Sequence, residues 1–269
     1  MFTKLLKQEW RATRGFLGLL CLICLGAAVL GGGAMRYLIW MSMQEADMTL
    51  GIVLCVLALV AAVLSLIVCG AASVVLLVAR FYKSRFTDEG YLTFTLPVTA
   101  HENLLSSLAN SAICVVLACV TILVCLAGML VFGFSGMEGF WTVFREDIPR
   151  LFRMVGYVLG ESPALVVLEV LNLVFGLACE LVVLMLSVTI GSVIAKKHKI
   201  IAAVAVYYGI HLGMSIADSA LMVGQGVAAL EGANMGVTFF ASSAALSLAI
   251  AVGGYFLTHW LISKRLNLN

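Results

Sequence analysis

The chain has 269 residues, of which 63% are hydrophobic and 11% are charged, and its mean hydropathy is +1.12. Soluble domains carry about 25% charged residues, so this composition excludes an ordinary soluble protein and indicates an integral membrane protein. The formal net charge of +2 is too small to suggest a nucleic-acid partner. We therefore expect one transmembrane domain over residues 1–269, with nearly all of its mass in or against the lipid bilayer.

The first 15 residues place apolar side chains near helical spacing beside four basic residues. The apolar members are Phe2, Leu5, Leu6 and Trp10, and the basic members are Lys4, Lys7, Arg11 and Arg14. This pattern predicts an N-terminal interfacial helix that meets anionic lipid head groups. The alternative is a simple positively charged anchor in front of the first span.

Six apolar runs follow, and each is long enough to cross about 30 Å of hydrocarbon at 1.5 Å per residue. They cover residues 16–38, 50–79, 104–134, 164–195, 200–223 and 237–262. A membrane β-barrel would alternate apolar and polar residues, whereas these runs are apolar throughout. The predicted fold is an all-α integral membrane protein with six transmembrane helices.

The basic residues predict how these spans are oriented. Twelve of the 16 lysines and arginines lie before the first run, between the second and third, between the fourth and fifth, or after the sixth. Loops rich in lysine and arginine remain in the cytoplasm. Both termini are therefore predicted to be cytoplasmic in a multi-pass membrane protein.

A polar, charged stretch at residues 81–103 separates the second and third runs. Residues 87–90 are expected to form a cap and a turn, and residues 91–96 a short amphipathic segment that Pro97 terminates. The sequence predicts a short, rigid cytoplasmic helix whose apolar side chains are exposed, which suggests a docking surface.

Thr99 follows this stretch and is expected to be the N-cap of the third span. Glu102 lies three residues later, which is the spacing of a capping box. The third helix is therefore predicted to begin immediately after Thr99.

An amphipathic external segment, residues 136–162, joins the third and fourth spans. Its apolar residues recur at helical spacing, and Glu146 and Arg150 form an i, i+4 pair. We expect one or two amphipathic helices that lie on the outer surface of the membrane or form a lid.

Ionisable and amide side chains within the spans are few, and such groups are costly in lipid. Glu169, Asn172 and Glu180 share a face of the fourth span, while His211 and Asp218 share a face of the fifth. They indicate either a polar track for a substrate or proton, or a buried helix interface with protonated or hydrogen-bonded carboxyl groups. The pattern leaves both interpretations open.

Motifs for catalysis or metal binding are absent from the sequence. All eight cysteines fall within apolar runs, and the pair Cys21 and Cys24 has no second pair or nearby histidine to complete a metal site. The sequence contains no phosphate-binding loop and no H-E-x-x-H or G-x-S-x-G motif. Glu169 and Glu180 lie about 16 Å apart along the helix axis, too far to share a proton. We expect a chain that is not an enzyme and binds no cofactor or metal itself.

Two segments resemble a known family, the permease subunits of type-2 ABC exporters found in Gram-positive bacteria. The stretch FTDEGYLTFTLPVTAHENLLSSL, residues 86–108, is similar to that family's pattern of EGYL, then TLPV, then a polar run into the third span. The basic segment LLKQEWRATRG, residues 5–15, is similar to its opening interfacial helix. The six-span layout with both termini inside agrees with this resemblance.

The resemblance implies that the cytoplasmic segment between spans two and three is a coupling helix, which enters a groove on a separate ATP-binding subunit. The implied coupling residues are Asp88, Glu89, Gly90, Tyr91, Leu92, Leu96 and Pro97. Two permease chains, identical or paralogous, and two ATPase chains would form a transporter in the bacterial plasma membrane, with ATP and Mg²⁺ bound to the partner. The short external segment differs from members that have large extracytoplasmic domains.

Two other functions fit the same sequence. One is an ion- or proton-coupled carrier that uses Glu169, Glu180 and Asp218. The other is a non-transporting membrane scaffold, in which residues 81–103 are an interaction motif. The sequence does not identify a transported substrate.

Overall fold

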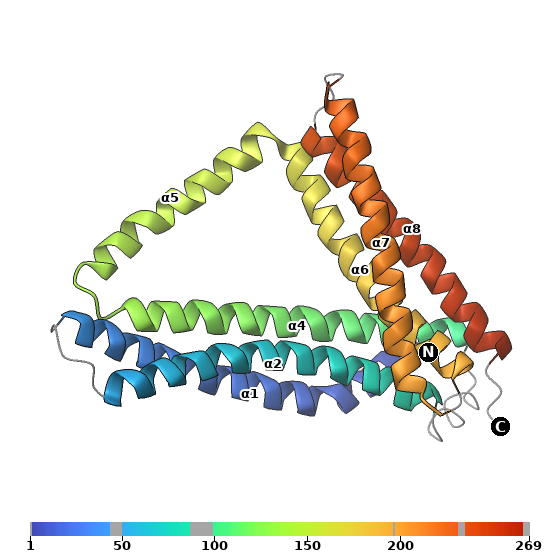
Figure 1. Cartoon of the computed structure of the whole chain (residues 1–269), viewed down its shortest axis with the longest axis horizontal. Helices are drawn as coiled ribbons and strands as arrows, with labels where there is room; N and C mark the ends of the chain where they lie inside the picture. The colour runs from blue at the N-terminus through green and yellow to red at the C-terminus, as the bar shows by residue number, and fades with distance from the viewer. Residues whose placement is uncertain (1, 44–49, 87–98, 196, 231–234, 266–269) are drawn as a thin grey trace. The chain divides into compact units, whose positions relative to one another are not determined.

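The computed structural model describes residues 2–43, 50–86, 99–195, 197–230 and 235–265, and these are all-α (Figure 1). The described helices are α1 (Phe2–Met43), α2 (Leu50–Phe86), α4 (Ala100–Phe134), α5 (Phe140–Glu161), α6 (Pro163–Ile194), α7 (Lys199–Leu230) and α8 (Met235–Arg265). Six of them, all except α5, are long and apolar enough to cross a membrane. The prediction of a multi-span, all-α membrane protein is confirmed.

The helices extend beyond the apolar runs that predicted them. The segment predicted as an interfacial helix forms the opening turns of α1, which continues without a break to Met43. Within it the Thr13 hydroxyl donates to the backbone carbonyls of Glu9 and Trp10 at 3.2 and 3.3 Å. Lysine, glutamine, glutamate and arginine favour helix, so the polar N-terminal residues extend the apolar helix instead of interrupting it.

The chain divides into two compact units, and α1, α2, α4 and α5 contribute to both. We call them the α1–α2 unit and the α6–α8 unit. The α1–α2 unit comprises Gln8–Leu77 and Ile113–Gly156, and the α6–α8 unit comprises Met1–Lys7, Val78–Ala112 and Tyr157–Asn269.

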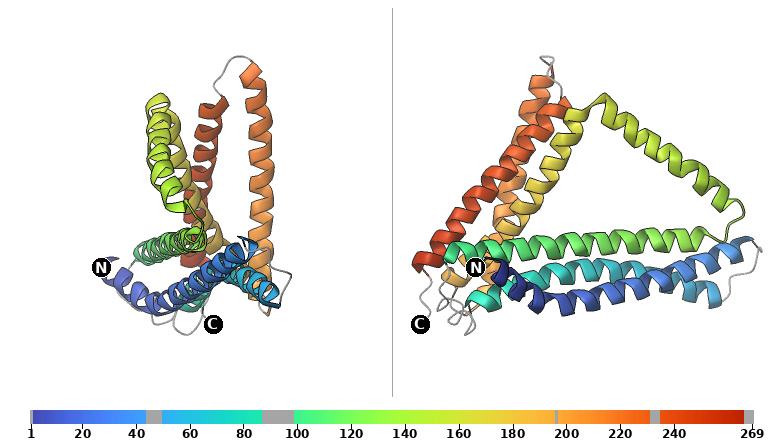
Figure 2. Two further views of the ribbon diagram at one scale, coloured as in Figure 1. Left: turned by 90° about the vertical axis from the view of Figure 1, so that its left-hand side faces the viewer. Right: turned by 180° about the vertical axis from the view of Figure 1, so that it is seen from behind.

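In the α1–α2 unit, α1, α2 and α4 run side by side (Figure 2), and residues from each of them form the core. The buried members are Leu20, Cys24, Ala28, Leu66, Cys69, Cys125 and Met129. A Cβ atom at Gly31 of α1 would lie 2.7 Å from both Ala62 Cβ and Met129 Sδ. Glycine at this position therefore lets α1 approach α2 and α4 closely.

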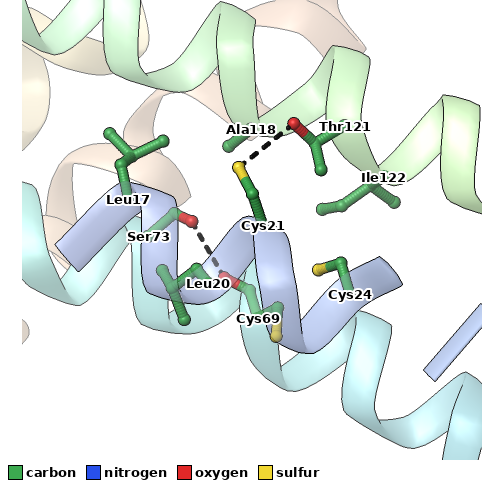
Figure 3. Close-up of a pocket in the computed structure, with 9 residues that line it drawn as sticks. All are labelled: Leu17, Leu20, Cys21, Cys24, Cys69, Ser73, Ala118, Thr121 and Ile122. Atoms are coloured by element: carbon green, nitrogen blue, oxygen red, sulfur yellow. Dashed lines mark hydrogen bonds between the residues drawn. The ribbon is translucent and has the colours of Figure 1, made fainter. Parts of the chain in front are cut away.

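All eight cysteines are free and lie within helices, and Cys21 and Cys24 face a small cavity between α1, α2 and α4 (Figure 3). Cys21 Sγ lies 3.4 Å from Thr121 Oγ1, and Ser73 Oγ donates to Cys69 O at 2.9 Å. The centre of a water molecule can occupy about 10 Å³ of this cavity. This volume is at the lower limit for holding one water molecule. This cavity is a packing gap and is too small for a substrate.

In the α6–α8 unit, α6 packs against both α7 and α8. Its C-terminal half is buried on nearly every side, with Val183 fully buried and Cys179 beside it in a core shared with Ala251 of α8. Helices that are apolar all round occupy the centre of a helical assembly. The second half of α6 is therefore the central element of this unit.

The predicted external segment forms a single helix, α5, after a turn in which Gly139 has a φ of +79°. The predicted pair of Glu146 and Arg150 is confirmed at 3.7 Å, but both side chains are more than 60% exposed, so the pair adds little stability. Near the end of α5, Tyr157 donates a hydrogen bond to the Glu161 carboxylate, which raises the pKa of the Tyr157 phenol above its ordinary value. Large apolar side chains of α5 are exposed, among them Trp141, Leu151, Phe152 and Met154.

Candidate functional site

The predicted coupling residues, Asp88, Glu89, Gly90, Tyr91, Leu92, Leu96 and Pro97, lie outside the described residues. The structure describes both flanks of this segment, the last turns of α2 and the first turns of α4. Both flanks belong to the α6–α8 unit. The contacts of these two flanks determine how firmly the ends of α2 and α4 on either side of the segment are held.

The flank at α4 is the predicted capping box. Thr99 Oγ1 accepts from the Glu102 backbone N–H at 3.2 Å, and Glu102 Oε2 accepts from the Thr99 backbone N–H at 3.3 Å. Two N–H groups at the helix start are thus satisfied reciprocally. The prediction that the helix begins directly after Thr99 is confirmed, because α4 starts at Ala100.

Thr99→Ala is expected to lower the free energy of unfolding by about 1 kcal/mol, because alanine cannot accept the hydrogen bond from the Glu102 N–H. Thermal unfolding of the purified chain in mild detergent measures this loss. Thr99→Ser retains the hydroxyl and serves as the matched control, with stability close to the wild type. Equal stability of the serine and alanine variants would contradict a capping role.

The flank at α2 ends in a buried arginine. Arg85 is only 1% exposed, and its Nη2 donates to both the backbone carbonyl and the side-chain Oδ1 of Asn103, at 2.8 and 3.2 Å. Its Nη1 donates to Ser107 Oγ at 3.2 Å and Ser84 Oγ at 3.3 Å, and the guanidinium lies 4.5 Å from the centre of the Phe81 ring. Arg85 therefore ties the last turn of α2 to the first turns of α4.

A polar stripe on α4 provides the acceptors for this arginine. Its members, spaced to share one helix face, are all buried: Asn103, Ser106, Ser107, Asn110 and Ser111. Sequence reasoning treated Arg85 only as a charge that sets orientation and missed this role. The signal that could have found it is the Asn and Ser repeat at i, i+3, i+4, i+7 and i+8 directly after a basic helix end.

The same region packs onto the core of the α6–α8 unit. Phe81 of α2 and Leu104 of α4 are each 2% exposed, and they share a cluster with Met185 and Val188 of α6 and Ile262 of α8. Nearby, the Tyr255 hydroxyl of α8 lies 2.7 Å from His101 Nδ1 of α4. The two flanks are consequently fixed to each other and to α6 and α8.

The predicted intramembrane residues do not gather in one place. Glu169 and Asp218 are exposed, and Asn172 is half-buried on α6. Glu180 is brought instead to α7, where Tyr207 donates to Glu180 Oε1 at 2.5 Å and His211 Nε2 lies 3.3 Å from Glu180 Oε2. Sequence reasoning placed His211 on a face with Asp218 and missed Tyr207, because neither helix pattern specifies which faces of α6 and α7 meet.

An open depression lies between the second half of α7 and the first turns of α8. Its volume is about 580 Å³, and its wall is mainly apolar. The polar members are Gln225, Thr238 and Ser242, of which Gln225 and Ser242 are hydrogen-bonded to each other. Among the described residues, no group of three histidine, cysteine or acidic side chains is arranged to hold a metal ion.

A scan against protein-family models and searches of curated proteins and solved structures found no match to this chain.

Proposed function

We propose that this chain is the membrane-spanning permease subunit of an ATP-driven ABC exporter. The six candidate spans and the EGYL and TLPV motifs of residues 86–108 support the proposal. In the proposed transporter, residues 81–103 contact a separate ATP-binding subunit, which binds ATP and Mg²⁺. A second permease chain, identical or paralogous, completes the transporter, and both termini of this chain lie in the cytoplasm of a bacterial cell.

The observation that carries the proposal is the attachment of the motif-bearing segment at both ends. Arg85 holds the end of α2, and the Thr99 and Glu102 capping box holds the start of α4. A segment that transmits a movement between subunits needs rigid ends, because a flexible connection would absorb the displacement. Movement of residues 87–98 by a partner would therefore be passed to two membrane-spanning helices together.

The first test is association with an ATPase. The tagged chain is purified from its native membranes in mild detergent, and ATP hydrolysis in the eluate is assayed together with the identity of any bound subunit. We expect a stoichiometric subunit that carries a phosphate-binding loop. An eluate without ATPase activity would contradict the proposal and favour the carrier or scaffold functions.

The second test changes the segment itself. Glu89→Lys and Leu92→Asp are expected to abolish ATPase association and ATP-dependent transport while leaving membrane insertion intact, because they reverse a charge and remove an apolar contact at the proposed interface. Lys197→Glu, at an exposed position in another predicted cytoplasmic connection, is the matched control and should retain association. Wild-type association in both segment variants would exclude this interface.

A further inference from the structure

A carboxylate, a phenol and an imidazole meet between α6 and α7. Tyr207 and His211 are one helical turn apart on α7, with ring centroids separated by 4.3 Å, and both reach Glu180 of α6. Each oxygen of the Glu180 carboxylate has its own neighbour, the Tyr207 hydroxyl for Oε1 and His211 Nε2 for Oε2. The contact of Oε2 with Nε2 has ion-pair distance but not hydrogen-bond geometry, so the buried Nε2 atom has no hydrogen-bond partner among the described residues.

These three residues lie deep within the spans. Glu180 is 17 residues after the start of α6 and 14 before its end, or about 25 and 21 Å along the axis. His211 is 12 residues after the start of α7, about 18 Å along its axis. An ionised carboxylate at such depth is costly unless another group compensates its charge.

The surroundings supply little other charge. On α6 the neighbouring titratable group is Cys179, which is 2% exposed. On α7 the others are Tyr208, in ring contact with Tyr207, and Asp218, which is exposed two turns beyond His211. From α8, the residues in the adjacent core are the apolar Ile250 and Ala251. Among the described residues, the polar side chains in contact with the Glu180 carboxylate are therefore those of Tyr207 and His211.

The cluster is open on one side within this chain. The Glu180 side chain is 41% exposed and that of His211 is 32% exposed, whereas the His211 Nε2 atom itself is buried. Carboxyl groups at membrane depth face water or protein rather than acyl chains. The open side therefore exposes the carboxylate to water or to another protein surface, while His211 Nε2 lies on the inner side.

We propose that Glu180, Tyr207 and His211 form an intramembrane proton-binding site that holds one exchangeable proton between Glu180 Oε2 and His211 Nε2. In the loaded state Oε2–H donates to the Nε2 lone pair, and the pair is neutral. On release the O–H bond breaks, the proton leaves to water, and the Tyr207 hydroxyl stabilises the remaining carboxylate. The site is independent of the proposed coupling segment.

Infrared difference spectroscopy of the purified chain in lipid nanodiscs, from about pH 4 to about pH 9, tests the site directly. We expect a carboxylic acid C=O band that disappears as pH rises and that is missing in Glu180→Gln. In Tyr207→Phe the band should move to higher frequency, because the carbonyl oxygen of the acid loses a hydrogen-bond donor. In His211→Phe the band should move to higher frequency, because the acid loses its acceptor.

Glu169→Gln, on the same helix at an exposed position, is the matched control and should retain the Glu180 band. Spectra of the wild type and Glu180→Gln that coincide over the whole pH range would overturn the proposal. A Glu180 band that is unchanged in both Tyr207→Phe and His211→Phe would also overturn it. The measurement needs no ATP-binding subunit, so its failure and that of the exporter proposal are separate results.

Discussion

Arg85→Ala is expected to lower the free energy of unfolding by about 3 kcal/mol, because several charge-assisted hydrogen bonds are lost and buried acceptors are left without a donor. The substitution removes the donors to Asn103 and Ser107 and the cation contact with Phe81. The chain should unfold at a lower temperature in mild detergent, as measured by intrinsic tryptophan fluorescence.

Two variants separate the geometry of Arg85 from its charge. Arg85→Lys keeps the charge but has one nitrogen in place of two, so it cannot reach Asn103 as Nη2 does and Ser107 as Nη1 does at once, and it should recover only part of the lost stability. Lys264→Ala, at an exposed position near the end of α8, removes a positive charge and should change stability by less than about 0.5 kcal/mol. Equal losses in Arg85→Ala and Lys264→Ala would refute a structural role for the buried network.

Gly191→Ala is the second substitution with a large expected effect. A Cβ atom at Gly191 of α6 would lie 2.5 Å from the backbone N and 2.6 Å from the Cα of Ala203 of α7. Backbone cannot yield as a flexible side chain does, so α6 and α7 must separate. We expect a loss of about 2 kcal/mol in the free energy of unfolding, as for other overpacked positions.

The separation should also be visible at Glu180, which lies on the same helix pair. A wider α6–α7 spacing weakens the hydrogen bond from Tyr207, so the infrared band of Glu180 should respond as it does in Tyr207→Phe. Gly209→Ala in α7 is the control, because the added Cβ would meet no described atom within 4 Å beyond the adjacent residues and backbone of its own helix. It should be neutral or stabilising by up to about 1 kcal/mol. A Gly191→Ala chain as stable as the Gly209→Ala chain would be inconsistent with the close approach.

Features that depend on neighbouring residues could be predicted from the sequence. The capping box of Thr99 and Glu102 and the ion pair of Glu146 and Arg150 follow from spacings of three and four residues, and both are present. The six spans follow from the length of the apolar runs. Helix ends could not be predicted from those runs, since hydropathy reports what lies in hydrocarbon and not where helical hydrogen bonding stops. Thus α2 continues to Phe86, beyond the predicted end at residue 79.

Features that depend on which helix faces meet could not be predicted. Arg85 and Asn103 are 18 residues apart, and Glu180 and Tyr207 are 27 residues apart. In both cases the partners lie on different helices, and an apolar helix can rotate its polar residue toward several neighbours at similar energy. The sequence indicates Glu180 only as an ionisable residue within a span, and its pairing with Tyr207 required the packing of α6 on α7.

The Arg85 network also bears on how the chain is made. Its hydrogen bonds close loops of only 18 and 22 residues, so they can form as soon as α2 and the first turns of α4 have left the ribosome. Met185, Val188 and Ile262, which complete the core around Phe81, are synthesised much later. The nascent chain can therefore acquire a fixed helical hairpin early, onto which the later helices assemble. Loss of Arg85 should then lower the yield of inserted protein during biogenesis as well as the stability of the finished molecule.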